Sequence, residues 1–92
     1  MRTITVYSKT NCQQCTATKR WLTKAGTPYE VKQVDLPLAS AERDIAAIKA
    51  LGYKGVPVTI VSRDGVPDEH WHGFRPDKLE AFCAADFEEK VA

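Results

Sequence analysis

The pattern of apolar and polar positions predicts alternating strands and helices along the chain. Residues 2–7 alternate Ile4 and Val6 with threonine and are rich in β-formers, which predicts a first strand. Residues 8–11 form a loop, and residues 13–25 place their apolar positions at helical spacing. The expected buried face of this helix carries Cys15, Thr18, Leu22 and Ala25. Gly26-Thr27-Pro28 follows and is typical of a helix end.

A second strand and helix come next. Residues 29–35 predict a strand in which Val31 and Val34 break strict alternation, which we interpret as coverage of both faces. After a connector over residues 36–39, Ser40 is a suitable N-cap for a helix over 41–51 that ends at Gly52. The expected buried side of this helix carries Ile45, Ile48 and Leu51.

The remaining segments predict a hairpin and a last helix. Residues 57–62 are the most β-rich stretch, and Asp64-Gly65 indicates a turn into an antiparallel strand near residues 68–71. Pro76 suits the first turn of a helix whose apolar positions are Leu79, Phe82, Cys83 and Phe87. The order β-α-β-α-β-β-α predicts an α/β domain over residues 1–92, with a four-stranded mixed sheet and three helices.

Composition and charge exclude several classes of protein. A chain of 92 residues holds one core and no separate nucleotide- or flavin-binding domain. Its 13 basic and 12 acidic side chains lack the basic excess of a nucleic-acid binder. No run of ~18 apolar residues exists for a membrane span, and no apolar signal segment opens the chain. We therefore expect a cytoplasmic monomer that binds neither nucleic acid nor membrane.

The nearly balanced charge is unevenly distributed. Residues 1–29 contain five basic side chains and no acidic one, whereas residues 64–92 contain eight acidic and three basic side chains. Lys19, Arg20 and Lys24 suit the C-terminal half of a helix, where cations are favourable. Lys9 lies three residues before Cys12, where a cation is suited to act on a thiolate or an acidic partner.

The three cysteines are the strongest chemical signal. Cys12 and Cys15, with two residues between them, follow the first predicted strand and begin the first predicted helix, a position typical of a redox pair. Residues three apart share a helix face, so their Cα atoms can approach to disulfide distance. Cys12 meets the unpaired N–H groups of the helix start, which favour its thiolate, while burial opposes ionisation of Cys15. We predict Cys12 as the nucleophile and Cys15 as the resolving cysteine.

Other uses of the cysteines stay open at this point. Cys12 and Cys15 also have the spacing of half a zinc site, but His70 and His72 are too close together for the other half. We therefore predict no metal ligands. A purely structural disulfide would be unusual in a reducing compartment. Cys83 lies on an apolar helix face and fits an inert core thiol, with intermolecular disulfide formation or regulation as alternatives.

Several motifs together resemble a known family. The segment Tyr7-Ser8-Lys9-Thr10-Asn11-Cys12-x-x-Cys15, with a later Val56-Pro57-Val58, resembles the glutaredoxin branch of the thioredoxin fold. Residues 17–22, 50–53 and above all Trp71-His72-Gly73-Phe74-Arg75-Pro76-Asp77 resemble more narrowly the NrdH-redoxins, glutaredoxin-like electron donors to class Ib ribonucleotide reductase. The resemblance covers roughly residues 3–82. It departs from the family at Gln13, His72 and Cys83.

The resemblance implies a function and further site residues. It implies an electron carrier of the thioredoxin fold with protein disulfide reductase activity, which binds no cofactor and receives electrons from NADPH through thioredoxin reductase. Its other implied partner is the large subunit of ribonucleotide reductase. Besides Lys9, the residues expected to tune the thiolate or the choice of partner are Gln13 and Gln14.

The later motifs are expected to bind the substrate and partners. The resemblance implies a cis Val56–Pro57 bond, with the Val56 backbone free to bind an extended substrate segment. The expected partner-docking motif is Trp71, His72, Gly73, Phe74, Arg75 and Pro76. Trp71 and Phe74 are equally suited to pack in the core between the hairpin and the last helix, and His72 is equally suited to be an exposed loop side chain. A glutathione-dependent glutaredoxin and a metal or iron–sulfur carrier remain the alternative functions.

Overall fold

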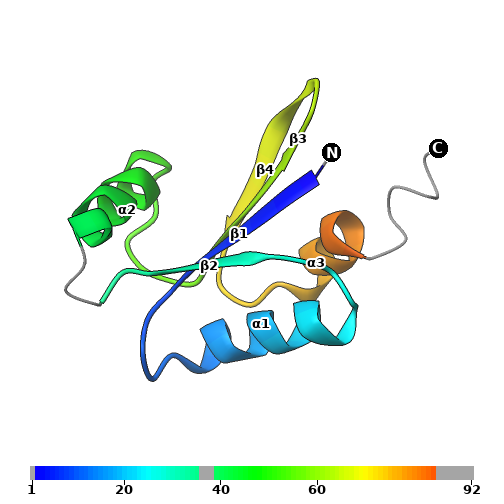
Figure 1. Ribbon diagram of the computed structural model, residues 1–92, viewed down its shortest axis with the longest axis horizontal. Coiled ribbons are helices and arrows are strands. Elements are labelled where there is room, and N and C mark those ends of the chain that lie inside the picture. Colours follow the sequence, from blue (N-terminus) through cyan, green and yellow to red (C-terminus); the bar gives the residue numbers. More distant parts are fainter. Residues whose placement is uncertain (1, 36–38, 85–92) are drawn as a thin grey trace.

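The computed structural model describes residues 2–35 and 39–84 of the chain. Its elements occur in the expected order (Figure 1): β1 (Arg2–Ser8), α1 (Gln13–Lys24), β2 (Glu30–Gln33), α2 (Ala39–Ala50), β3 (Val58–Arg63), β4 (Val66–His72) and α3 (Pro76–Cys83). The predicted α/β class, with four strands and three helices, is confirmed. Each predicted boundary on the described residues lies within two residues of the observed one.

The four strands form one mixed sheet in the order β2-β1-β3-β4. The β1-α1-β2 unit makes a parallel pair, with Val6 opposite Val31. β3 runs antiparallel to both β1 and β4, and Thr59 lies opposite Val6 on one side and Trp71 on the other. β1 and β3 are therefore the central strands, and the loop after β1 leaves the middle of the sheet.

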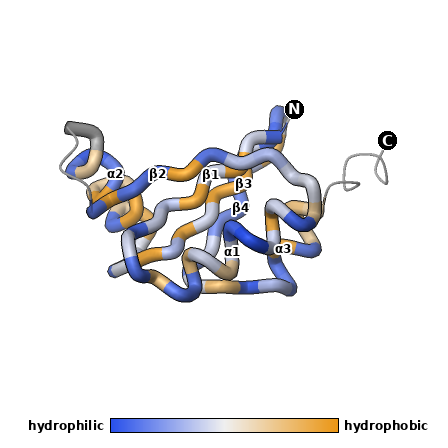
Figure 2. Tube along the Cα trace, turned by 60° about the horizontal axis from the view of Figure 1, so that its bottom comes forward, coloured by the Kyte–Doolittle hydropathy of each residue, from blue (hydrophilic) through white to orange (hydrophobic). Residues whose placement is uncertain are grey.

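Helices cover both faces of this sheet (Figures 1 and 2). On one face, α1 and α3 pack against the sheet around a core that includes Leu22, Leu79 and Trp71. On the other face, α2 packs through Ile48 against Tyr7 and Val58. Because β1 lies between the two layers, its alternating side chains contribute to both cores, and the loop that follows it is firmly anchored.

The interpretation of residues 29–35 as a strand covered on both faces is wrong. β2 spans only four residues and lies at the edge of the sheet, with β1 as its neighbour. Val31 is 40% exposed in consequence, whereas Val34 lies beyond the strand and packs against the core under α2. The irregular spacing of the two valines thus marks the end of the strand.

The buried face of α2 also differs from the prediction. The helix begins at Ala39, so Ser40 lies in its first turn instead of preceding it. The buried side chains are Ala41, Asp44 and Ile48, and Ile45 is half-buried. Leu51 lies beyond the helix end and is 37% exposed, because the chain turns away at Gly52, which has φ +92°.

Two long-range contacts hold the end of α3. The Arg2 guanidinium donates to the carbonyl oxygens of Phe82 and Ala84 at 3.0 and 3.1 Å. The Thr27 hydroxyl donates to the Cys83 carbonyl at 2.6 Å. These donors occupy carbonyls that a helix end leaves without intrahelical partners. Pro76 occupies the first turn of the helix, as predicted.

The described helices do not include one long and apolar enough to cross a membrane. Phe87, expected on the apolar face of the last helix, lies outside the described residues. The Cys83 side chain is fully buried in the core beside α1. Burial raises the pKa of its thiol from 9.0 to about 11. Cys83 therefore carries no thiolate in the folded protein at neutral pH.

Alkylation separates Cys83 from the reactive pair. When the reduced protein is treated with iodoacetamide at pH 8.5, Cys83 should stay unmodified in the native state and react quickly in urea. Because the folded pKa is raised, the thiol contributes to stability below pH 9, and that contribution is lost as the pH rises through about 11. Peptide mass spectrometry measures the labelling. Equal labelling of Cys83 in buffer and in urea would contradict its burial.

Candidate functional site

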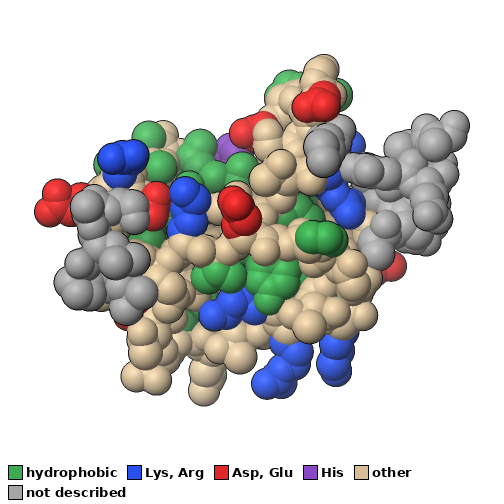
Figure 3. All heavy atoms as spheres, in the orientation of Figure 1, with side chains coloured by type: hydrophobic (Ala, Val, Ile, Leu, Met, Phe, Trp, Pro, Cys, Tyr) green, Lys and Arg blue, Asp and Glu red, His purple; other side chains and the backbone are tan. Residues whose placement is uncertain are grey.

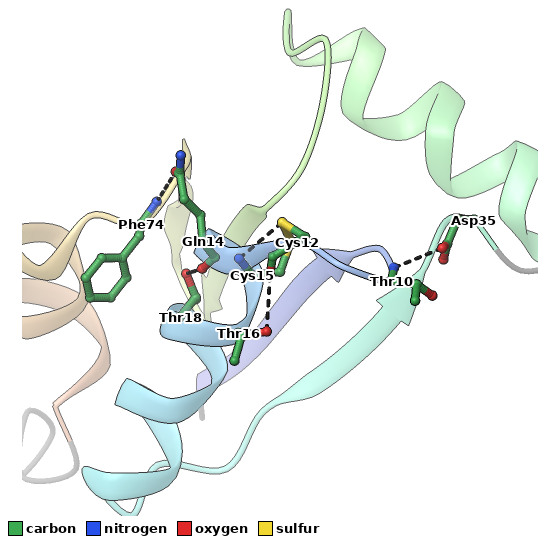
Figure 4. The surroundings of a disulfide bond; sticks show 8 residues. All are labelled: Thr10, Cys12, Gln14, Cys15, Thr16, Thr18, Asp35 and Phe74. Atoms are coloured by element: carbon green, nitrogen blue, oxygen red, sulfur yellow. Dashed lines mark hydrogen bonds between the residues drawn. A yellow bond between two sulfur atoms is a disulfide. The ribbon is translucent and has the colours of Figure 1, made fainter.

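The predicted dithiol lies at the first turn of α1 (Figure 4). Cys12 and Cys15 are joined by a disulfide, with their Cα atoms 5.2 Å apart. Cys12 is the N-cap of the helix and has extended backbone angles, φ −112° and ψ 107°. Its side chain is partly exposed, whereas Cys15 is fully buried on the inner face of the helix. A partner can therefore reach the Cys12 sulfur and not that of Cys15.

The helix start creates a favourable place for negative charge at Cys12. The backbone N–H of Cys15 donates to Cys12 Sγ at 3.2 Å, as the side chain of an N-cap residue allows. The first turn contains no acidic residue that would oppose this field. The Cys12 carbonyl is also fixed, because it accepts from the backbone N–H and the hydroxyl of Thr16 at 3.0 and 3.1 Å. The Cys15 N–H is thus the donor directed at Cys12 Sγ, where it favours negative charge on the sulfur.

The loop before Cys12 is tied to the end of β2 by Asp35. The Thr10 backbone N–H donates to the Asp35 carboxylate at 2.9 Å. Hydrogen bonds from the Thr10 backbone and side chain lower the pKa of Asp35, and the charge of Lys9 adds to this. Asn11 follows with φ +57°, a left-handed conformation that asparagine tolerates better than most residues. Sequence reasoning missed Asp35, because no local motif connects positions 25 residues apart.

The segment that follows β4 is joined to the loop before β3. The Val56–Pro57 bond is cis, the configuration that the resemblance implies. The Gly73 N–H donates to the Pro57 carbonyl at 2.8 Å. In the described ranges, the backbone N–H and carbonyl of Val56 have no hydrogen-bond partner. They are therefore available to a bound chain.

A second contact joins this segment to the dithiol. Gln14 Oε1 accepts a hydrogen bond from the Phe74 N–H at 3.0 Å, which Figure 4 shows beside Cys12 and Cys15. Gly73 adopts φ +85°, and a Cβ atom at that position would lie 2.9 Å from Gln14 Oε1. Only glycine meets both conditions without displacing Gln14. Both glutamines are exposed, but Gln14 is bonded to the segment after β4, whereas Gln13 lines the hollow at Cys12.

The predicted docking motif divides between the core and the surface. Trp71 is 3% exposed and stacks on Phe82 with ring centroids 6.1 Å apart. It therefore packs in the core, which was the alternative to a docking role. Phe74 is half-buried against the same core. Three further residues of the motif lie at the surface: His72, Arg75 and Pro76.

The surface residues of this motif have partners within the chain. His72 stacks on Tyr53 with ring centroids 6.0 Å apart. Arg75 donates to both carboxylate oxygens of Asp77, at 3.1 and 2.9 Å, which lowers the pKa of that carboxyl. This pairing fixes the direction of the Arg75 guanidinium. Phe74 and His72 are the aromatic members of the motif that are not fully buried.

Cys12 opens into a surface hollow of about 380 Å³. Arg20 is the cation that lines this hollow, whereas Lys9 lines a separate hollow with Val56. Lys9, predicted to act on a thiolate or an acidic partner, does not line the hollow at Cys12, whereas Arg20, predicted to suit the helix C-terminus, does. The spacing indicates this position of Arg20, since residues 12, 16 and 20 lie at i, i+4 and i+8 on one face of α1.

No group of three or more metal-ligating side chains occurs within the part of the chain that the structure describes. His70, considered above as a zinc ligand, accepts or donates a hydrogen bond with the Tyr53 hydroxyl at 2.8 Å. Cys83 lies in the core, away from the pair on α1. The two cysteines on α1 are joined by a bond that thiol–disulfide exchange can break and form again.

The fold and the Cys12–Cys15 pair define a thiol–disulfide oxidoreductase of the thioredoxin fold. The family model for glutaredoxin matches residues 4–66. The glutaredoxin-like proteins NrdH of Escherichia coli K12 and Salmonella typhimurium are 38% and 37% identical to this chain over 76 residues, 83% of each protein. The solved structure of NrdH-redoxin from Escherichia coli superimposes with a TM-score of 0.65 at 32% identity, covering 84% of this chain and 90% of that one. The chain belongs to the glutaredoxin family and, within it, to the NrdH-redoxins.

The position of Gln14 Oε1 beside residue 73 leads to a prediction about stability. Gly73→Ala and Gly65→Ala each place a side chain at positive φ, which costs roughly 1–2 kcal/mol. Gly65 has open space around it, whereas the new methyl at 73 displaces Gln14 from Phe74. Gly73→Ala should therefore lose a further ~0.5–1.5 kcal/mol of unfolding free energy in urea titrations.

A Gln14→Ala background provides the control. With Gln14 truncated, no side-chain oxygen remains for the methyl to displace, so the two glycine substitutions should cost the same. If Gly73→Ala stays costlier than Gly65→Ala in that background, the extra cost does not come from Gln14.

Proposed function

We propose that this protein carries electrons to disulfides in other proteins. Its principal substrate is the large subunit of class Ib ribonucleotide reductase, and NADPH-dependent thioredoxin reductase restores its dithiol. The observation that carries this proposal is the asymmetry of the pair, with Cys12 at the surface and Cys15 buried. An accessible sulfur that accepts an N–H at a helix start, with a second thiol behind it, is suited to attack a disulfide and then release the product.

The first step forms a mixed disulfide. The Cys12 thiolate attacks one sulfur of the substrate disulfide, so a Cys12–substrate bond forms and the substrate S–S bond breaks. The electron pair of the broken bond leaves on the second substrate sulfur, which takes up a proton. The Cys15 N–H, 3.2 Å from Cys12 Sγ in the oxidised form, is the donor that favours the attacking thiolate.

The second step releases the substrate. Cys15 gives up its proton and attacks Cys12 Sγ, which closes the Cys12–Cys15 disulfide and expels the remaining substrate sulfur as a thiolate. That thiolate takes up the proton, so the substrate gains two electrons and two protons in all. Burial of Cys15 disfavours its ionised form and keeps it from competing with Cys12 for the first attack.

The loop before β3 supports substrate binding in this scheme. The Val56 backbone groups, unpartnered within the described residues, fit an extended segment that adds alongside them. Lys9 lines the hollow beside Val56, where it meets the flank of such a segment. Gln13 lies at the rim of the Cys12 hollow and contacts the partner there.

Thioredoxin reductase is favoured over glutathione as the source of electrons. At the turn after Trp71, His72 and Arg75 are exposed and Phe74 is half-buried, and Arg75 is already paired with Asp77. This leaves no set of acidic side chains at the turn to hold a tripeptide ammonium group. The related Escherichia coli protein is described as a glutaredoxin-like protein with a thioredoxin-like activity profile.

A comparison of reductants tests the assignment. Reduction of the Cys12–Cys15 disulfide should proceed with NADPH and thioredoxin reductase, and much more slowly with NADPH, glutathione and glutathione reductase. NADPH absorbance follows both reactions, with a conventional glutathione-dependent glutaredoxin as the control. Turnover confined to the glutathione system would identify a glutathione-dependent glutaredoxin instead. Colour or zinc retained by the purified protein would point to a carrier of iron–sulfur clusters or metal.

Trapping tests the two cysteine roles. Cys15→Ser removes the resolving sulfur, so the mixed disulfide should accumulate on Cys12 when the reduced variant meets oxidised ribonucleotide reductase. Non-reducing electrophoresis and peptide mass spectrometry identify the linkage. Cys12→Ser is the matched variant and should trap nothing, because Cys15 is buried. Adducts on Cys83, or equal trapping by both variants, would overturn the assignment.

A further inference from the structure

We propose that the outer face of α1 is a docking groove for the segment of the substrate protein that flanks its disulfide. The segment that fits is acidic and carries one large apolar side chain. This inference rests on the proposed function and adds to it the surface that selects the substrate. It concerns the helix face beyond Cys12, which shares only Phe74 with the docking motif at residues 71–76.

The groove is continuous with the reactive sulfur. The hollow at Cys12 extends along α1 through Thr16 to Ala17 and Arg20. A second hollow of about 220 Å³ begins at the same Ala17 and Arg20 and ends between Lys24 and Phe74. Because both hollows share two lining residues, a chain bonded to Cys12 can follow the helix without leaving the surface.

The charge of the groove is positive and unopposed. Arg20 and Lys24 are exposed, and neither forms an ion pair with another described residue. Residues 1–29 contain no acidic side chain. Figure 3 shows Lys and Arg side chains and no acidic one along the lower edge of the molecule, where α1 lies in Figure 1. Such a surface favours carboxylates on the partner.

The far end of the groove is apolar. Trp21 and Phe74 are half-buried there and pack against the main core, which holds their rings in place. The Gln14 hydrogen bond to the Phe74 N–H fixes the backbone that carries one of these rings. A preformed aromatic surface costs little ordering when a partner side chain packs on it. The occupant therefore carries an aliphatic or aromatic residue near this end.

The length of the helix sets the length of the segment. The 12 residues of α1 span about 18 Å at ~1.5 Å per residue. An extended chain covers that distance in about five or six residues at ~3.3 Å each. Acidic residues within six positions of the substrate cysteine are thus in reach of Arg20 and Lys24, and the apolar residue lies toward the end of that stretch.

The hollow beside Val56, which is separate from the groove, supplies a matched control. Lys49 and Lys54 line a hollow of about 240 Å³ against α2 with Val56. Both are exposed cations, as Arg20 and Lys24 are, but Lys49 lies on α2 and Lys54 in the loop that follows it. Lys49→Glu/Lys54→Glu changes the net charge as much as Arg20→Glu/Lys24→Glu does. At equal change of net charge, the two double variants therefore separate the α1 groove from the hollow beside Val56, where Lys9 is proposed to meet the flank of the substrate.

The test uses two synthetic peptides with the same intramolecular disulfide. One has a six-residue tail with three glutamates and a leucine, and the other has glutamine in place of each glutamate. Reduction by the reduced protein is stopped with acid and measured by chromatography at about 0.01 M and about 1 M salt, where the screening length falls from ~30 to ~3 Å. The ratio of the two rate constants is the readout, because a change in Cys12 reactivity affects both peptides equally.

The wild type should reduce the acidic peptide roughly tenfold faster than the amide peptide at low salt, and the ratio should approach one at high salt. Arg20→Glu/Lys24→Glu should abolish the preference, and Lys49→Glu/Lys54→Glu should keep it. Replacing the leucine with serine should slow the acidic peptide several-fold. Circular dichroism checks that each variant is folded.

Two results would overturn the groove. One is equal reduction of both peptides by the wild type, and the other is loss of preference in the α2 variant with retention in the α1 variant. Either result leaves the proposed function intact as long as both peptides and hydroxyethyl disulfide are reduced. If the protein reduces neither peptide nor hydroxyethyl disulfide, the proposed function itself is refuted.

Discussion

The hydrogen bond from the Cys15 N–H to Cys12 Sγ is the interaction on which the site depends. It exists because the chain enters α1 through an extended Cys12, and the helix start therefore points at the sulfur. That entry is prepared upstream by the central strand β1, by the left-handed turn at Asn11 and by the Asp35 carboxylate, which holds the Thr10 N–H. A shift in any of these would turn the sulfur away from the helix axis, where its field is strongest. Reactivity at Cys12 is thus a consequence of how the loop before it is held.

Two further contacts bring distant parts of the chain to this point. Gly73 donates to the Pro57 carbonyl, and Gln14 accepts from Phe74, so the segment after β4 joins the dithiol to the loop before β3. The residues between the cysteines consequently have different tasks. Gln14 fixes a neighbouring loop, whereas Gln13 lines the hollow at Cys12. Gln14 Oε1 accepts a hydrogen bond from the Phe74 N–H and therefore lies close to residue 73. Glycine at position 73 leaves room for this oxygen, because it has no Cβ atom.

The sequence predicted features that depend on local chemistry and missed those that depend on long-range packing. The order of elements, the position of Cys12 at a helix start and the burial of Cys15 follow from periodicity and capping, which act within a few residues. Asp35 could not be assigned, because its partner Thr10 lies 25 residues away. Val31 and Leu51 were placed inside because they are apolar, yet one lies on an edge strand and the other beyond a helix end. Arg20 was visible as a helical neighbour of Cys12, but its exposure needed the structure.

The arrangement also separates reactivity from choice of partner. Donors that stabilise the Cys12 thiolate make it a ready nucleophile, but they stabilise the reduced pair and so weaken its reducing power, by 30 mV for each ~1.4 kcal/mol. Burial of Cys15 acts in the opposite direction, because it disfavours an ionised dithiol. Strengthening the field at Cys12 to attract one partner would therefore lower the driving force toward all of them. Cations along α1, beyond the first turn, avoid this conflict, since they act on the flank of the substrate more than on the sulfur. The placement of Lys24 at the far end of the helix, three turns from Cys12, is what makes that separation physically reasonable.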